Sequence, residues 1–200
     1  MSETARARWN ARWSEREMRA LEGDPAPWLV QSHERAPVTA GARALDVACG
    51  DGRNAAYLAG LGFTVDAVDV SDVAVAAVRR AAADRGLAVR ACRMDLEQAA
   101  LPEARYAVVV QFNYLQRDLF AALAASLIPG GVVIAETFAR RHADPRRGRI
   151  DPRYLLADDE LRTAFPGLEV LRYRELITGS PASPRAVAGI VARRPSGATA

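Results

Sequence analysis

Short apolar segments alternate with helical ones along the middle of the chain, and this alternation restricts the fold more than any other feature of the sequence. The apolar segments are 44–47, 63–70, 88–93, 106–112 and 132–137. The segments between them that have helical composition are 53–59, 72–85 and 115–127. Ser71 is a suitable N-cap for the second helix and Gly86 a suitable end. This order predicts an α/β fold with a doubly wound, mostly parallel sheet and helices on both faces.

The two ends of the chain depart from this pattern. Residues 1–38 are polar, rich in arginine and punctuated by proline, which predicts one or two short helices. Near the other end, 158–165 predicts a helix, whereas 168–176 and 186–193 predict two strands with no helix between them, hence an antiparallel hairpin. We expect an N-terminal helical segment over residues 1–38, one domain with a seven-stranded sheet over 39–195, and a disordered tail over 196–200.

Composition excludes several classes of function. All 27 basic residues among the 200 are arginine, so chemistry that needs a lysine amine is excluded: a pyridoxal Schiff base, a Walker-type phosphate loop and Tyr-x-x-x-Lys hydride transfer. The net charge of +3 does not favour nucleic-acid binding. Two cysteines are too few for a disulfide framework, and no cluster has the spacing of a metal site. Without an apolar leader or a segment that spans a bilayer, we expect a cytoplasmic protein that binds neither membrane nor nucleic acid.

The most informative segment is the glycine-rich turn that follows the first strand, from Leu45 to Asn54. Gly50 and Gly52 allow the backbone to approach a ligand closely. Asp69 ends the second strand 17 residues after Gly52, where a carboxylate can accept hydrogen bonds from both hydroxyls of a ribose. Because the carboxyl ends of neighbouring parallel strands form the ligand edge of such sheets, these residues predict an adenosine-containing ligand.

Charge discriminates between two ligands of this kind. The spacing Gly50-x-Gly52-x-x-Ala55 also fits a relaxed dinucleotide motif. Asp46, however, lies at the end of the first strand beside the loop, and at about 4 Å and an effective dielectric constant near 20 it would repel a pyrophosphate by about 4 kcal/mol. S-adenosylmethionine carries a sulfonium and an ammonium and no phosphate. The sequence therefore favours the methyl donor over a nicotinamide dinucleotide.

These motifs resemble those of the class I S-adenosylmethionine-dependent methyltransferases, over residues 42–140. Residues 45–52 match the first motif of the family, with Ala48 in place of its first glycine. Asp69 matches the ribose-binding acid, 94–96 match the segment beside adenine, and 128–131 match the structural Pro-Gly-Gly turn before the fifth strand. The resemblance implies a Rossmann-like methyltransferase fold and S-adenosyl-L-methionine as the cofactor.

The N-terminal segment resembles, more narrowly, the tellurite-resistance and thiopurine-like branch of these enzymes. Residues 9–13 are similar to its Trp-Asp-x-Arg-Tyr opening but depart from it at Asn10 and Trp13. Residues 25–30 and 52–54 are similar to its Pro-x-Pro-aromatic-Leu and Gly-Arg-Asn segments. In that branch the N-terminal segment lies over the cofactor. The cofactor-binding residues that the resemblance implies are Trp9, Arg12, Asp46, Ala48, Cys49, Gly50, Gly52, Asn54, Asp69, Val70, Ser71, Met94, Asp95, Leu96 and Gln111.

Candidates for the acceptor side follow the fourth and fifth strands. Six arginines within 140–153 either bind an anionic acceptor or belong to a solvated loop. His142 is a candidate base or an idle exposed side chain, and His33 is a less favoured candidate. Asn113-Tyr114 lacks the Pro-Pro of the amino-methylating enzymes, and Tyr114 either faces the pocket or packs against a helix. Cys49 suits the loop as a small residue rather than as a nucleophile.

Together these features predict in-line methyl transfer to a small acceptor such as an oxyanion, a thiol or a carboxylate. Orientation alone can supply about 7–11 kcal/mol of the barrier, so no side chain is required as a catalytic base. Two alternatives remain, a non-catalytic module that binds S-adenosylmethionine and an NAD-dependent Rossmann oxidoreductase. The expected partner is a small-molecule methyl acceptor, and the chain is a monomer or a homodimer.

Overall fold

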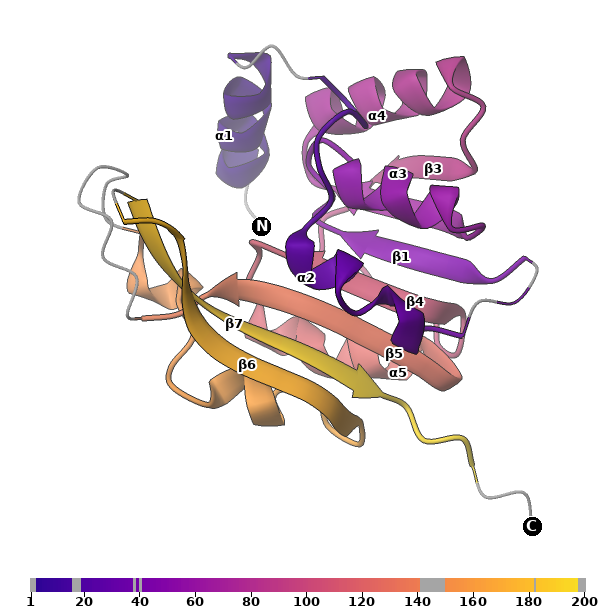
Figure 1. Ribbon diagram of the computed structural model, residues 1–200. Helices are drawn as coiled ribbons and strands as arrows, with labels where there is room; N and C mark the ends of the chain where they lie inside the picture. The colour runs from indigo at the N-terminus through magenta and orange to yellow at the C-terminus, as the bar shows by residue number, and fades with distance from the viewer. Residues whose placement is uncertain are drawn as a thin grey trace.

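The computed structural model describes residues 3–15, 19–37, 39, 41–140, 150–181 and 183–197, and its strands form one mixed sheet (Figure 1). The strands are β1 (Arg43–Val47), β2 (Thr64–Asp69), β3 (Val89–Arg93), β4 (Tyr106–Phe112), β5 (Leu127–Phe138), β6 (Glu169–Ser180) and β7 (Ser183–Arg193). The α-helices are α1 (Glu3–Ser14), α2 (Pro27–Val30), α3 (Arg53–Gly60), α4 (Asp72–Asp84) and α5 (Phe120–Ser126). Short 3-10 helices are η1 (His33–Arg35), η2 (Arg117–Leu119), η3 (Pro152–Tyr154) and η4 (Glu160–Thr163).

The strand order is β3-β2-β1-β4-β5-β7-β6. Pairing is parallel from β3 to β5, and β7 runs antiparallel to both β5 and β6. The predicted seven-stranded, mostly parallel sheet with a C-terminal antiparallel hairpin is thereby confirmed. The winding reverses direction between β1 and β4, and ligands of doubly wound sheets bind at the carboxyl ends of strands at such a point. The ligand site is therefore expected where β1 and β4 end.

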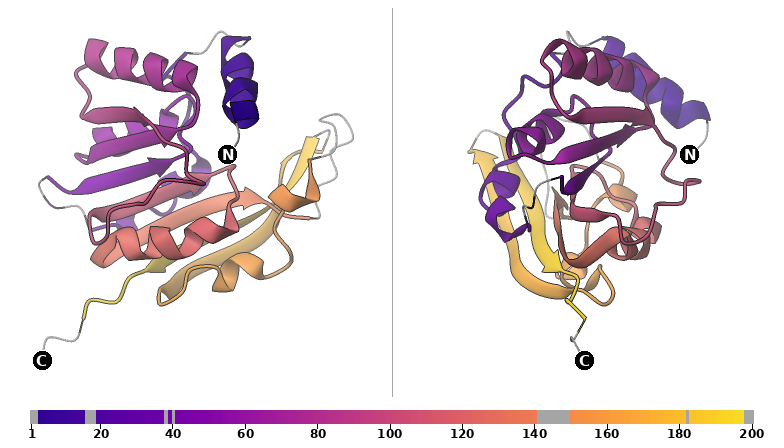
Figure 2. Two further views of the ribbon diagram at one scale, coloured as in Figure 1. Left: turned by 180° about the vertical axis from the view of Figure 1, so that it is seen from behind. Right: turned by 90° about the vertical axis from the view of Figure 1, so that its right-hand side faces the viewer.

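Helices cover both faces of the sheet, as predicted (Figure 2). Side chains alternate along β1, so that Leu45 and Val47 join the core beneath α5 and η4, whereas Ala44 joins the core beneath α2 and α3. A smaller core, with Val78 at its centre, joins α4 to β3. Asp46 lies on the same face of β1 as Ala44 because side chains two residues apart share a face. This acidic side chain therefore points toward α3.

Two predicted helices differ in the structure. The segment 115–127 becomes helical only at Arg117, because Gln116 has extended backbone, and β5 starts at Leu127. The prediction of an α-helix over 158–165 is wrong, since the segment contains only the 3-10 turn η4. Asp159 has a left-handed φ of 57°, and Pro166 disfavours helical backbone in the residue before it.

The N-terminal segment contains α1, α2 and η1, which confirms the short helices predicted there. α1 packs against α4 at the side of the sheet where β2 ends (Figure 1). Residues 198–200 lie outside the described residues, so the disordered tail stays a prediction, as do the domain limits. In the described ranges, no helix is both long enough and apolar enough to cross a membrane.

Charged side chains surround a buried acid on β2. Residues 94–105, which join β3 to β4, contain a hydrogen-bonded turn at 95–99 but no assigned helix. Asp66 of β2 is only 3% exposed and accepts hydrogen bonds from Arg43 (2.8 Å), Arg90 (2.9 Å) and the Tyr106 hydroxyl (3.1 Å). Burial alone would raise the pKa of Asp66, but the hydrogen bond and charge of Arg43, together with Arg90, lower it. These partners compensate the burial of the Asp66 carboxylate.

Candidate active site

Left-handed residues shape the loop between β1 and α3. Ala48, Gly50 and Gly52 have φ angles of 53°, 55° and 75°. Cys49 N–H donates to the Val68 carbonyl and Gly52 N–H to the Cys49 carbonyl, both at 2.9 Å. An alanine in left-handed backbone costs about 1–2 kcal/mol, which explains why the family motif has glycine where this chain has Ala48. The replacement of the family's glycine by Ala48 therefore strains the backbone of the loop.

The N-terminal segment lies directly on this loop. A Cβ on Gly50 would come within 2.8 Å of Trp13 Cζ2, and a Cβ on Gly52 within 2.7 Å of Leu21 Cδ2. Leu21 N–H also donates to the Asp51 carbonyl at 2.8 Å. Leu21 was not among the predicted site residues, because nothing in its local sequence distinguishes it from an ordinary apolar residue. Both glycines are required here by close packing as well as by backbone conformation.

Asp46 is buried beneath the loop, with 1% of its surface exposed. Burial is the main cause that raises the pKa of Asp46 to about 8, although a hydrogen bond from the Ala55 N–H opposes it. Within the described part of the chain, its Oδ2 has no hydrogen-bond partner. A buried carboxylate oxygen without a donor suits a cationic group. The methionine end of S-adenosylmethionine, with its ammonium and sulfonium, fits this requirement, whereas a pyrophosphate does not.

Asp69 holds the loop from the neighbouring strand. It is 7% exposed, and its Oδ2 accepts the Gly50 N–H and its Oδ1 the Ser71 N–H, both at 2.9 Å. Burial raises the pKa of Asp69 against the effect of these hydrogen bonds. Val70 is buried, and the Ser71 side chain caps α4 by accepting the Ala74 N–H, as predicted. A role of Asp69 in binding ribose stays a prediction.

The predicted N-terminal residues lie on α1 beside this edge. Trp9 is partly buried, whereas Arg12 is exposed, with its guanidinium 5.2 Å from the Trp9 ring centroid. Asn10 was not among the predicted cofactor-binding residues, although its departure from the family motif was visible in the sequence. Its side chain bonds Ser71 at the start of α4. The structure thus brings α1, the loop and the end of β2 together.

The ends of β3 and β4 form the other side of the site. Met94 N–H donates to the Asp69 carbonyl at 2.9 Å, which fixes the segment 94–96 next to β2. Asp95 accepts the Glu97 N–H, and Leu96 is buried in the core. These positions agree with the edge predicted for adenine, and adenine binding itself stays a prediction.

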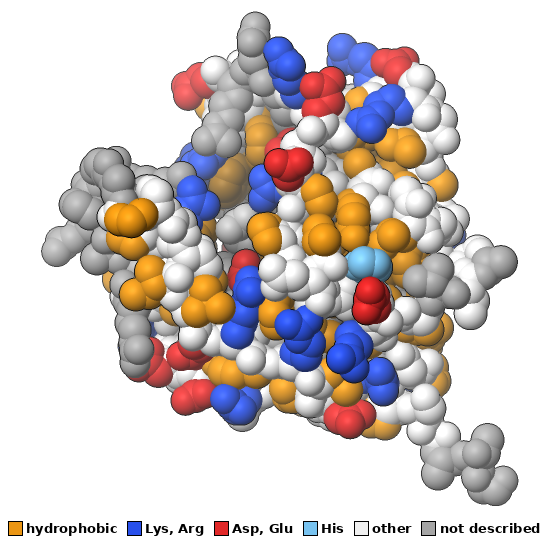
Figure 3. All heavy atoms as spheres, viewed as in Figure 1, with side chains coloured by type: hydrophobic (Ala, Val, Ile, Leu, Met, Phe, Trp, Pro, Cys, Tyr) orange, Lys and Arg blue, Asp and Glu red, His pale blue; other side chains and the backbone are white. Residues whose placement is uncertain are grey.

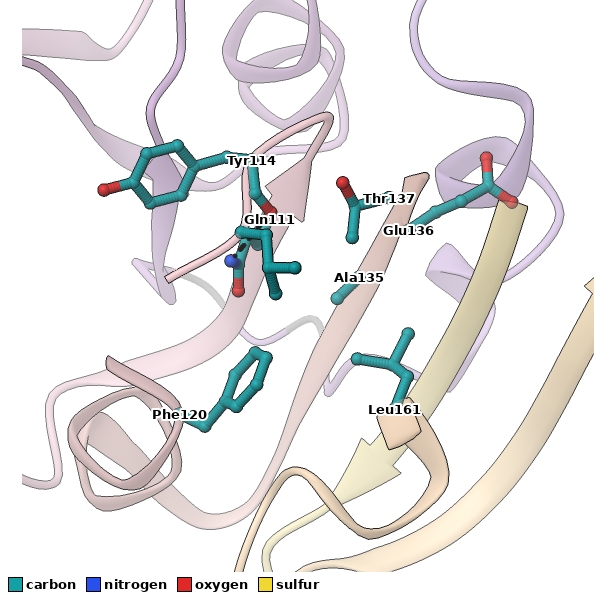
Figure 4. A pocket seen from close by; sticks show the side chains of 8 residues that line it. Gln111, Tyr114, Phe120, Ala135, Glu136, Thr137 and Leu161 are labelled. Atoms are coloured by element: carbon teal, nitrogen blue, oxygen red, sulfur yellow. Dashed lines mark hydrogen bonds between the residues drawn. The ribbon is translucent and has the colours of Figure 1, made fainter. Parts of the chain in front are cut away.

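Gln111 and Tyr114 line a small pocket where β4 and β5 end (Figure 4). Gln111 is 2% exposed, and its Nε2 donates to the Tyr114 carbonyl at 3.1 Å. The Tyr114 hydroxyl donates to Gln116 Oε1 at 2.6 Å. Burial, followed by Glu97 and Asp95, raises the pKa of Tyr114 well above its usual value. Tyr114 is therefore a neutral phenol, and its ring points away from Thr137, Ala135 and Phe120 on the other sides of the pocket (Figure 4).

Three predicted candidates have structural partners. Asn54 is buried, and its Oδ1 accepts the Ala26 N–H at 2.9 Å, which ties α3 to the N-terminal segment. Burial, followed by nearby carboxylates, raises the pKa of the Cys49 thiol, so this cysteine is a packed small residue rather than a nucleophile. His33 contacts the Val30 carbonyl and the Tyr57 hydroxyl, away from the loop.

Trp28 fastens the N-terminal segment to the far end of the sheet. It is 2% exposed, and its Nε1 donates to the Ile190 carbonyl at 3.3 Å. The guanidiniums of Arg172 and Arg174 lie 4.5 and 4.0 Å from its ring centroid. Arginine side chains gather on this face between α2 and β6 (Figure 3). We call Trp28, Arg172 and Arg174 the tryptophan clamp.

The arginine-rich segment is only partly described. Arg141, His142, Arg146, Arg147 and Arg149 lie outside the described residues, so their predicted roles stay predictions. Arg140 and Arg153, with Arg117, line a cavity of about 450 Å³ beyond β5. Arg117 forms a paired hydrogen bond with Glu160 (2.5 and 2.9 Å). In the described ranges, no group of three or more His, Cys, Asp or Glu side chains is arranged to hold a metal ion.

Residues 44–131 match the family model of a methyltransferase domain. The chain is 33% identical over 151 residues to hemagglutinin 1 of Eikenella corrodens, a match that covers 72% of this chain and 49% of the relative. It is 38% identical over 68 residues to thiopurine S-methyltransferase of Xanthobacter autotrophicus, covering 34% of this chain and 32% of the relative. The matched part thus spans half or less of the length of these relatives.

Two solved structures share the fold. One is reported for the conversion of a disulfide bond into a thioacetal group during echinomycin biosynthesis; it has a TM-score of 0.72 at 21% identity and covers 98% of this chain and 95% of that one. The other is TehB from Haemophilus influenzae, with a TM-score of 0.68 at 19% identity, covering 84% of this chain and 61% of that one. The chain thus contains a methyltransferase domain over residues 44–131, within a fold that it shares with solved S-adenosylmethionine-dependent methyltransferases.

Proposed function

We propose that the protein transfers a methyl group from S-adenosylmethionine to a small nucleophile. The observation that carries this proposal is the buried Asp46 carboxylate, whose second oxygen has no hydrogen-bond partner in the described part of the chain. It lies beneath a loop of left-handed residues at the point where the sheet reverses its winding. A cationic donor stabilises the ionised form of this buried acid, whereas the pyrophosphate of a dinucleotide would disfavour that form further.

The bound donor supplies an electrophilic methyl group and a neutral sulfide leaving group. The residues of this chain hold and orient it: Asp46 accepts from the ammonium end, Asp69 fixes the loop and offers its remaining acceptor capacity to the ribose, and α1 excludes water above them. Orientation of this kind can lower a barrier by about 7–11 kcal/mol. The Tyr114 phenol, already bonded to Gln116, is poorly suited to act as a base. A nucleophile that is soft or already ionised needs no base, and we propose an acceptor of this kind.

For the acceptor we propose a small anion or thiol. Arg140 and Arg153 line the cavity beyond β5, whereas the third arginine, Arg117, is neutralised by Glu160. Exposed guanidiniums favour oxyanions and carboxylates. Arg153 pairs with Asp151 at 2.7 Å, and Arg140 lies close enough to Glu160 to lower the pKa of that carboxyl.

Calorimetry with S-adenosylmethionine, S-adenosylhomocysteine and NAD tests the donor. We expect binding of the first two and none of NAD; the reverse result would mean an oxidoreductase. A screen that follows a labelled methyl group onto small thiols, oxyanions and carboxylates tests the reaction. If the donor binds but no methyl group leaves it with any acceptor, the chain is a non-catalytic binding module and the proposed activity fails.

A further inference from the structure

The N-terminal helix α1 touches the rest of the molecule through one narrow stripe. Among its described side chains, Ala5, Trp9, Asn10 and Trp13 are partly buried, and the other side chains are exposed. Residues 5, 9 and 13 are four apart and so share one face of the helix. This stripe meets the start of α4 and the glycine-rich loop.

Asn10 makes the central polar contact of this stripe. Its Oδ1 accepts the Ser71 hydroxyl at 2.7 Å and the Val73 N–H at 3.4 Å, and its Nδ2 donates to Asp72 at 3.4 Å. Asn10 therefore binds the first turn of α4 with both ends of its amide. Near it, Arg6 pairs with Asp72 at 2.6 Å, but both side chains are more than 40% exposed. Exposed ion pairs contribute little, so the amide is the stronger anchor.

The contact at Ser71 continues into the donor site. Ser71 N–H donates to Asp69 Oδ1, and Gly50 N–H donates to Oδ2 of the same carboxylate, both at 2.9 Å. A continuous series of hydrogen bonds thus runs from Asn10 through Ser71 and Asp69 to the loop. One turn further along α1, Trp13 packs on Gly50 directly. The helix reaches the loop by two routes.

We propose that Asn10 is a positioning residue of the donor site, a role that rests on the proposed function. Its amide fixes Ser71 and, through it, the orientation of the Asp69 carboxylate. Docking of α1 and binding of the donor therefore stabilise each other. Thermodynamic linkage makes this coupling reciprocal: the donor stabilises the docked position of α1 by the same factor by which docked α1 strengthens donor binding. A substitution that loosens α1 therefore weakens donor binding.

Binding of S-adenosylhomocysteine to Asn10→Ala and to Arg6→Ala, measured by calorimetry, tests this role. Both substitutions remove one anchor of α1, but only Asn10 contacts Ser71. We expect affinity to fall about tenfold for Asn10→Ala and less than about twofold for Arg6→Ala. Hydrogen exchange gives an independent readout: the ligand should slow exchange in α1 and at Gly50 in the unsubstituted protein and in Arg6→Ala, but not in α1 of Asn10→Ala.

A paired substitution separates positioning from simple loss of packing. Asn10→Asp keeps an oxygen that accepts from Ser71, but its charge repels Asp72. Adding Asp72→Asn restores the hydrogen bond between positions 10 and 72, with the amide at position 72 now the donor and the carboxylate at position 10 the acceptor. We expect the double variant to regain the affinity that Asn10→Asp loses. Equal affinities for Asn10→Ala and the unsubstituted protein would overturn the role of Asn10 alone. If the unsubstituted protein does not bind S-adenosylhomocysteine, the proposed function itself fails.

Discussion

Asp46 lies in an environment that disfavours its own charge. Because burial raises its pKa from 3.8 to about 8, the unfolded chain loses this proton at a lower pH than the folded chain does. The stability that Asp46 contributes is therefore complete below about pH 4 and is lost as the pH rises toward 8. Asp46→Asn cannot ionise. We expect the free energy of unfolding of this variant to exceed that of the unsubstituted protein by about 1–3 kcal/mol at pH 8, as measured by urea denaturation.

The gain in stability should be accompanied by a loss of donor binding. Asp46→Asn removes the charge that attracts the ammonium end, so S-adenosylhomocysteine should bind about tenfold or more weakly. Asp51→Asn is a matched control, because it removes a carboxylate from the same loop at a partly exposed position. It should change neither quantity appreciably. Unchanged affinity in Asp46→Asn would contradict the assigned role of this carboxylate.

Gly50 is required by its φ of 55° and by the indole of Trp13. Gly50→Ala should lower the free energy of unfolding by about 1–2 kcal/mol through left-handed backbone alone. It should also displace Trp13, and donor affinity should fall with it. Gly62→Ala is the control: its φ is 95°, but no atom lies within 4 Å of the added Cβ. Denaturation and calorimetry should show reduced stability in both variants and reduced affinity only in Gly50→Ala.

At the scale of elements, the tryptophan clamp joins α2 to β6 and β7. Trp28→Ala removes a buried indole, its hydrogen bond to Ile190 and both arginine contacts, so we expect a loss of about 3–5 kcal/mol in the free energy of unfolding. Trp28→Phe keeps an aromatic ring and should lose less. Trp9→Ala is the comparison, because Trp9 lies on α1 and is only partly buried. If urea denaturation shows equal losses for Trp9→Ala and Trp28→Ala, the clamp does not fasten the segment.

Elements with strong local signals were predicted well. β4 follows the bounds read from its run of valines, and α4 begins after Ser71 as its cap predicted. The α-helix predicted over 158–165 does not form, because the backbone of Asp159 is left-handed and Pro166 disfavours helical backbone in the residue before it. Such local backbone preferences involve only one or two residues. A pattern read over the length of a helix does not detect them.

At the scale of the whole molecule, the loop and its acids were predictable because their spacing is local in sequence. The contacts of Leu21 with Gly52 and of Asn10 with Ser71 join positions 31 and 61 residues apart. Such contacts depend on how the N-terminal segment crosses the sheet, which no local pattern specifies. The glycine-rich loop and its acids could therefore be predicted from the sequence, whereas the contacts of Leu21 and Asn10 from the N-terminal segment could not.

Donor binding should change the protonation of the whole protein. At pH 7 the empty protein holds Asp46 mostly protonated, since its pKa is about 8, and a bound ammonium favours the ionised form. Binding should therefore release up to one proton, and affinity should rise with pH by up to about tenfold per unit until about pH 8. Calorimetry at pH 7 in phosphate and in Tris measures the release, because the observed enthalpy then depends on the buffer's own heat of ionisation. That dependence should disappear in Asp46→Asn and persist in Asp51→Asn; identical enthalpies in both buffers for the unsubstituted protein would mean that Asp46 does not meet the cationic end of the donor.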